Sequence, residues 1–74
     1  MKITVKLFAT FRDGRDKIQV LELEPGKTPE YVIAILGIVK SEIAIFLVNG
    51  RDGKFDKQLL EGDLIALFPP VGGG

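Results

Sequence analysis

The start of the chain alternates polar and apolar residues without interruption. Over residues 2–7 every odd position is apolar. Successive side chains of a strand point to opposite faces, so this segment predicts a half-buried strand. The side chains expected in the core are Ile3, Val5 and Leu7. Phe8 continues the alternation on the opposite face.

A second strand is predicted over residues 17–23, after an Asp-Gly turn signal at Gly14. The two segments form a predicted hairpin. Its register stays open, because two pairs of apolar residues alternate in opposite phases. One pair is Ile18 and Val20, and the other is Leu21 and Leu23.

A short helix is predicted to begin at Thr28-Pro29 and to end before Gly37. Threonine is a good N-cap, and proline at the first helical position loses no hydrogen bond. Glycine after the last turn can adopt a positive φ. At about 8–9 residues the helix would be marginal alone, so it must pack on the sheet. Its apolar stripe is Val32, Ile33 and Leu36, with Val32 and Leu36 expected in the core.

The second half of the chain predicts two further strands and a hairpin turn. Residues 43–48 are apolar on both faces, which predicts a strand with little solvent exposure. Asn49-Gly50 is a strong hairpin signal, followed by a short polar return over residues 51–55. Residues 64–68 form the last predicted strand, with Ile65 and Leu67 in the core.

The predicted order is strand, strand, helix, strand, irregular stretch, strand. One helix covers only one face of a sheet, so the expected fold is α+β: a mixed four- to five-stranded sheet with the helix across one face. We expect a single domain over residues 1–70 and a flexible glycine tail over residues 71–74.

Composition excludes several classes of site. The 74 residues contain no cysteine and no histidine, which excludes Cys/His zinc sites and nucleophile–histidine catalysis. Ten basic and ten acidic residues cancel, so we expect no nucleic-acid partner. Apolar runs are too short to span a bilayer, no membrane role is expected, and nothing indicates export, so the expected location is cytoplasmic. Gly26-Lys27-Thr28 resembles the end of a phosphate loop, but Leu21 stands where that motif needs glycine.

The charged side chains of the predicted turns form neither a cation site nor an identifiable partner contact by their spacing. The acidic residues have no calcium-loop spacing and are interpreted as solvated turn residues. They are Asp52, Asp56, Glu61 and Asp63. The scattered arginines are interpreted as surface charges. They are Arg12, Arg15 and Arg51.

The glycine run Gly72-Gly73-Gly74 is the most informative feature of the sequence. It buries nothing and loses much backbone entropy on ordering, so it has no use in folding. It follows a predicted strand and the stiff pair Pro69-Pro70. Such an arrangement projects a thin peptide from a rigid body, and a narrow channel in a partner's active site can admit it.

At this point the chain resembles the ubiquitin-like sulfur carriers of the MoaD/ThiS type, and most closely the small subunits of molybdopterin synthase. The resemblance covers the whole chain. Its most specific part is the ending Pro69-Pro70-Val71 with Gly73-Gly74, preceded by Phe68. Weaker matching pieces are Leu7-Phe8-Ala9, the Pro-Gly-x-Thr helix start, Val48-Asn49-Gly50 and Gly62-Asp63.

The resemblance implies a β-grasp fold and a non-catalytic carrier. An E1-like enzyme of the MoeB/ThiF type would adenylate the carboxylate of Gly74 with ATP and magnesium, and a sulfur donor protein would convert it to a thiocarboxylate. This chain would bind no cofactor or metal. The implied acceptor is the MoaE-type large subunit of molybdopterin synthase. Both the E1 and the large subunit would dock on an apolar sheet surface near the tail, and the contact residues implied are Phe8, Phe68, Pro69, Pro70 and Val71.

Three features leave the pathway open. Asp52 stands where an apolar residue is common in the family, and Pro29 replaces an apolar residue of the first helical turn. The triple glycine is typical of the thiamine-pathway carriers (ThiS), whereas the Pro-Pro pair favours the molybdopterin carriers. The alternatives are therefore a ThiS-type carrier, or a ubiquitin-like modifier conjugated through Gly74. A plain interaction module with an inert tail is a further possibility.

Overall fold

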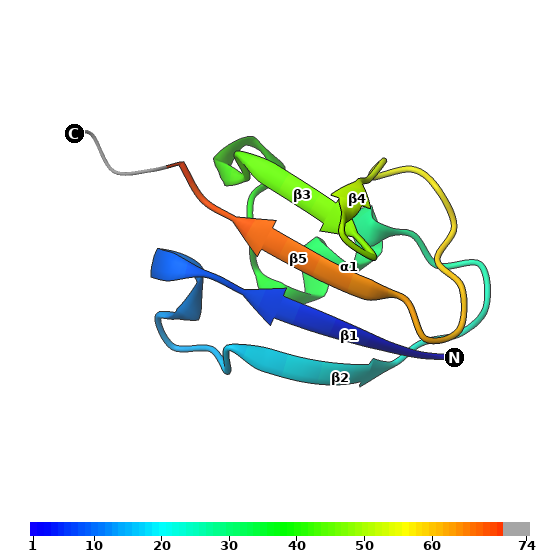
Figure 1. Ribbon diagram of the computed structural model, residues 1–74. Coiled ribbons are helices and arrows are strands. Elements are labelled where there is room, and N and C mark those ends of the chain that lie inside the picture. The colour runs from blue at the N-terminus through cyan, green and yellow to red at the C-terminus, as the bar shows by residue number, and fades with distance from the viewer. Residues whose placement is uncertain (71–74) are drawn as a thin grey trace.

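The computed structural model describes residues 1–70, and within them the chain forms a five-stranded mixed sheet with one α-helix across one face (Figure 1). The elements are β1 (Lys2–Leu7), η1 (Ala9–Arg12), β2 (Ile18–Glu22), α1 (Pro29–Leu36), η2 (Lys40–Glu42), β3 (Ile45–Val48), β4 (Arg51–Asp52) and β5 (Leu64–Phe68), where η marks a 3-10 helix. The strand order is β2-β1-β5-β3-β4. The central pair, β1 and β5, is parallel, and the other neighbours are antiparallel.

Pairing of β1 with β2 resolves the register that the sequence left open. Val20 lies opposite Thr4, and Ile18 lies opposite Lys6. Residues directly opposite in a sheet share a face. Ile18 and Val20 therefore lie on the face away from α1, which we call the open face. Leu23 is buried on the helix side.

The core lies between the sheet and α1 and contains six of the seven predicted residues. Ile3, Val5, Leu7, Val32, Ile65 and Leu67 are all fully buried. The seventh prediction was wrong: Leu36, in the last turn of α1, is only partly buried against the core. Phe11, which the sequence did not single out, enters the core from η1.

The ends of α1 use backbone geometry and one distant arginine. Thr28 has an extended backbone at the N-cap, but its side chain makes no capping hydrogen bond. Gly37 adopts the predicted left-handed conformation, with φ +73°. Arg15 donates through Nε to the carbonyl oxygen of Leu36 at 2.9 Å. It thereby satisfies a carbonyl without an intrahelical partner. Arg15, interpreted from the sequence as a surface charge, is partly buried and covers the end of the helix.

The third strand is shorter and more exposed than predicted. It begins at Ile45, because η2 occupies residues 40–42 just before it. Ile45 is 50% exposed on the open face, whereas Phe46 is buried in the core. An apolar run therefore does not mark both faces as buried in this strand.

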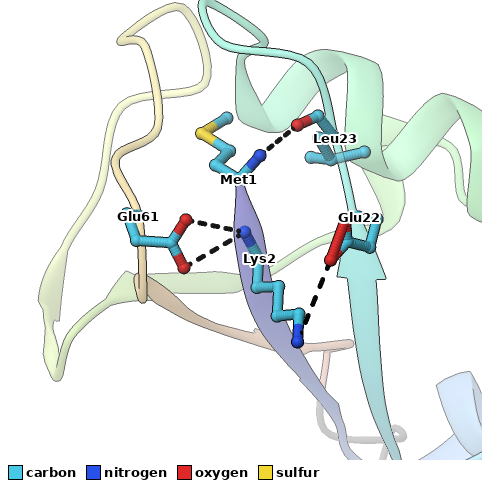
Figure 2. A network of polar contacts seen from close by, with 5 residues as sticks. All are labelled: Met1, Lys2, Glu22, Leu23 and Glu61. Atoms are coloured by element: carbon cyan, nitrogen blue, oxygen red, sulfur yellow. Dashed lines mark hydrogen bonds and ion pairs between the residues drawn. The ribbon is translucent and has the colours of Figure 1, made fainter.

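Two of the acidic turn residues hold the end of the sheet opposite the tail. Asp63 accepts hydrogen bonds from the Asn49 side-chain amide at 2.9 Å and from the backbone N–H of Leu60 at 2.8 Å. Glu61 accepts the backbone N–H of Lys2 at 3.1 Å, as Figure 2 shows. In the described residues 1–70 no group of three His, Cys, Asp or Glu side chains is placed to hold a metal ion.

Gly53 follows β4 and has no room for a side chain. A Cβ there would lie 2.6 Å from Val48 Cγ2 and 2.7 Å from Phe46 Cε2. Real Cβ atoms essentially never approach so closely, and Phe46 is part of the core. We therefore expect Gly53→Ala to lower the free energy of unfolding by about 1–3 kcal/mol.

Chemical denaturation measures this change. Gly14→Ala is the matched control, because φ is +70° there but nothing lies within 4 Å of the added Cβ. Its cost is backbone strain alone, of about 1–2 kcal/mol. If Gly53→Ala unfolds at the wild-type denaturant concentration, the packing of Phe46 against Gly53 is incorrect.

Candidate functional site: an apolar surface beside the tail

Apolar side chains gather on the open face where β5 ends. Ile45 of β3 lies opposite Phe68, and Leu47 lies opposite Ala66. The parallel register of β1 with β5 brings Phe8, just after β1, alongside Phe68. We call these five residues, from three chain segments, the tail-side surface.

The two phenylalanines form the centre of this surface. Their ring centroids are 4.1 Å apart and the ring planes differ by 9°, so the rings are stacked. Both are partly exposed on the face away from α1, as the alternation of β1 and β5 predicts. A stacked aromatic pair contributes about 0.5–1.5 kcal/mol beyond its buried area.

Arg12 packs over the Phe8 ring of this aromatic stack. Its guanidinium lies 5.3 Å from the centroid of the Phe8 ring, within the range of a cation–π contact. Its Nε also donates to the carbonyl oxygen of Leu7 at 2.8 Å. The short helix η1, which contains Arg12, thus fixes Phe8 on the open face. Arg12 is exposed, which agrees with its interpretation as a surface charge, and it also contacts Phe8.

Charged residues limit the tail-side surface on two sides. Lys6 lies between Ile18 and Ala66 in the strand registers and is partly buried. Asp52 lies opposite Leu47 and is exposed at the β4 edge. The carboxylate that the sequence flagged therefore stands next to the apolar residues. A partner that covers this surface must leave Asp52 in water or pair it with a cation.

The tail begins directly from the tail-side surface. Phe68 is the last residue of β5, and Pro69 and Pro70 follow it with no further strand pairing. Pro69 is partly buried and Pro70 is exposed. The other predicted site residues lie outside the described residues: Val71, Gly72, Gly73 and Gly74. A partner bound to this surface would therefore cover the point from which the tail departs.

Sequence reasoning missed two members of the tail-side surface, Ile45 and Leu47. Residues 43–48 are apolar at every position, so the pattern does not indicate which side chains face the core and which face the open side. The pairing of Ile45 with Phe68 places Ile45 and Leu47 on the open face. Contiguous exposed apolar patches of this kind mark interaction sites in soluble proteins.

No described helix of the chain combines the length and apolar character needed to cross a membrane.

Comparisons with solved structures place this arrangement among β-grasp proteins. SAMP1 from Haloferax volcanii superimposes with a TM-score of 0.79 at 23% identity, covering all of both chains. A putative molybdopterin converting factor subunit 1 from Pyrococcus furiosus superimposes with a TM-score of 0.75 at 29% identity, covering 96% of this chain and 99% of that one. A chain from the complex of subunits 1 and 2 of the molybdopterin-converting factor from Helicobacter pylori superimposes with a TM-score of 0.67 at 21% identity, covering all of both chains.

A search of curated protein sequences gave no match. The model of the ThiS family, in contrast, matches residues 5–74, which is nearly the whole chain. The fold is a ubiquitin-like β-grasp, as the resemblance implied. With the family model and the fold in agreement, the chain belongs to the ThiS family, the sulfur-carrier family that includes the MoaD-type proteins.

Proposed function

We propose that this protein is a sulfur carrier in the biosynthesis of molybdopterin, the organic part of the molybdenum and tungsten cofactors. The Gly74 carboxylate is adenylated by an E1-like enzyme and converted to a thiocarboxylate. The observation that carries the proposal is the stacked Phe8–Phe68 pair at the base of Pro69-Pro70, which gives a partner a docking surface next to the tail.

The proposed chemistry begins with a poor electrophile. At neutral pH a carboxylate resists attack by sulfur, whereas its mixed anhydride with AMP has a good leaving group. The C-terminal carboxylate attacks the α-phosphorus of ATP and releases pyrophosphate. A persulfide or sulfide then attacks the acyl carbon and releases AMP. After reduction of any acyl disulfide by a thiol, the tail ends in a thiocarboxylate whose sulfur is the nucleophile to be transferred.

The roles divide between this chain and its partners. This chain supplies the substrate carboxylate and the docking surface, and acts as a non-catalytic subunit. The E1-like partner, of the MoeB/ThiF type, binds ATP and magnesium, and a separate donor protein supplies the sulfur. Small side-chain-free residues at Gly72 and Gly73 allow the tail to enter a narrow active site.

The molybdopterin pathway is supported by two features. The ending Phe68-Pro69-Pro70-Val71 is typical of MoaD-type carriers, and a solved structure at 29% identity is described as a molybdopterin converting factor subunit. By analogy with the complex of subunits 1 and 2 from Helicobacter pylori, we propose a MoaE-type large subunit as the second partner. The triple glycine keeps thiamine thiazole synthesis as the alternative pathway.

Sulfur transfer to a defined acceptor tests the pathway. The thiocarboxylate form of the chain is mixed with the large subunit of molybdopterin synthase and the sulfur-free pterin precursor, and molybdopterin is measured. The matched reaction replaces these with thiazole synthase and its substrates. We expect product only with the molybdopterin components. Product only with thiazole synthase would assign the chain to thiamine synthesis instead.

A protein-modifier role is the second candidate, and the likeness to SAMP1, described as a small archaeal modifier protein, favours it. A lysine amine then attacks the acyl carbon of the same adenylate, which releases AMP and leaves an isopeptide bond to Gly74. Immunoblots from the host after denaturation distinguish the two roles. A series of larger covalent species that requires Gly74 indicates conjugation, whereas a single band of the free chain indicates a carrier.

A further inference from the structure

The outer edge of β2 has unpaired backbone groups. In the described residues β2 has a strand on one side only, as Figure 1 shows. The Leu7 N–H donates to the carbonyl of Lys17 at 2.8 Å, and the Leu23 N–H donates to the carbonyl of Met1 at 2.8 Å. Antiparallel pairs alternate between bonded and non-bonded positions. The even-numbered residues of β2 therefore direct their N–H and C=O groups outward, with Val20 at the centre.

This edge has only one of the usual protections against pairing, the exposed charge of Glu22 at the end of the strand. Natural edge strands are kept very short, bulged, charged or interrupted by proline. The opposite edge, β4, fits this rule, because it has only two residues. In contrast, β2 has five residues without proline, and its pairing with β1 runs without a bulge. Ile18 is 51% exposed and Val20 is 64% exposed beside those outward backbone groups.

We propose that β2 pairs antiparallel with β2 of a second copy of this chain, about a two-fold axis through Gln19. In this register Ile18 lies opposite Val20 of the second copy, and the symmetry repeats the pair. The outward groups of these two residues then form hydrogen bonds across the interface. The two Gln19 side chains meet on the other face. The edge is thus complementary to itself, and the two sheets join into one.

Charges at the ends of the paired strands set the strength and the salt response of this dimer. Glu22 faces Asp16 of the second copy, and both residues are exposed. Lys2 Nζ lies 4.0 Å from Glu22 Oε1 in the same copy and offsets part of this repulsion (Figure 2). Screening of exposed charges weakens what remains. Added salt should therefore strengthen the dimer, whereas it would weaken one held by ion pairs.

The dimer would be weak and would leave the tails free. One five-residue strand pair buries less than the roughly 1,200 Å² at the low end of stable interfaces. Association is therefore expected only at high protein concentration. β1 separates β2 from β5, from which the tail departs. Because the β2 strands of the two copies run in opposite directions, the two tails would leave from opposite ends of the joined sheet.

The test follows backbone amide resonances of the full chain as its concentration is raised to the millimolar range, beside sedimentation equilibrium. We expect concentration-dependent shifts centred on the N–H groups of Ile18, Val20 and Glu22. Val20→Pro removes an outward donor that the monomer does not use, and proline is tolerated on edge strands. It should weaken association by at least about tenfold, since each copy loses a cross-interface hydrogen bond.

Two further variants complete the test. Ile45→Thr, at the other side of the open face, should leave association unchanged. If circular dichroism shows that Val20→Pro does not fold, Ile18→Lys replaces it and should weaken association to a similar extent. The proposal is overturned if the wild-type chain stays monomeric with unshifted β2 amides, if salt weakens the dimer, or if Ile45→Thr is the change that disrupts it.

Discussion

Removal of Gly74 is expected to abolish adenylation of the chain. In the proposed mechanism, the E1-like partner must align one terminal carboxylate with the α-phosphate of ATP. A displacement of even about 1 Å can reduce such a reaction roughly 100-fold. One extended residue moves the terminus by about 3.3–3.6 Å. ATP–pyrophosphate exchange with the cognate E1 measures the loss, and addition of one residue after Gly74 should be equally damaging.

Substitutions within the tail provide the matched comparison. Gly73→Val should also be severe, because its branched side chain would crowd a narrow channel. Gly72→Thr should be mild, because the resemblance places it at a position that varies. None of these changes should alter the melting temperature, since Phe68 ends the last strand before the tail. Full exchange by the chain lacking Gly74 would show that this terminus is not the activated group.

Replacement of Phe8 or Phe68 by glutamate is expected to disrupt docking far more than folding. Central aromatic residues of an interface often contribute about 2–4 kcal/mol, so binding to the E1 or the large subunit should weaken by roughly 30- to 1,000-fold. Loss of the ring stack should lower the free energy of unfolding by only about 0.5–1.5 kcal/mol. A binding isotherm and a melting curve for each variant separate the two effects.

Ile35→Glu is the control for these variants. Ile35 is 51% exposed on α1, which covers the other face of the sheet, so its change adds the same charge away from the tail-side surface. It should bind both partners as the wild type does. If Ile35→Glu weakens binding as much as Phe8→Glu, the docking surface has been assigned to the wrong face. If Phe8→Glu unfolds the domain, Phe8 is a core residue rather than a contact.

The local pattern of polar and apolar residues was sufficient to predict an element wherever one of its faces is polar. The alternation of residues 2–7 predicted the bounds of β1, its buried residues and the exposed face of Phe8. Helix-terminus signals similarly predicted α1 and the positive φ of Gly37. The aromatic stack then follows from the parallel register of β1 and β5, which the sequence did not specify.

Features that depend on distant contacts could not be predicted in this way. Leu36 matches the apolar stripe of α1, but it lies at the last turn, where Arg15 covers the helix end and the core stops. Phe11 follows an exposed stretch, and only η1 returns it to the core. The need for glycine at Gly53 arises from Phe46, seven residues earlier, and leaves no local signal.

The most direct test of the proposed mechanism is the intact mass of the chain after incubation with the cognate E1, ATP, magnesium and a sulfur donor. Exchange of one carboxylate oxygen for sulfur should raise the mass by about 16 Da, and fragmentation should place the change on Gly74. The increase should be absent without ATP. An unchanged mass with an active E1 and donor, or a sulfur located elsewhere in the chain, would contradict the assignment of Gly74 as the sulfur-bearing residue.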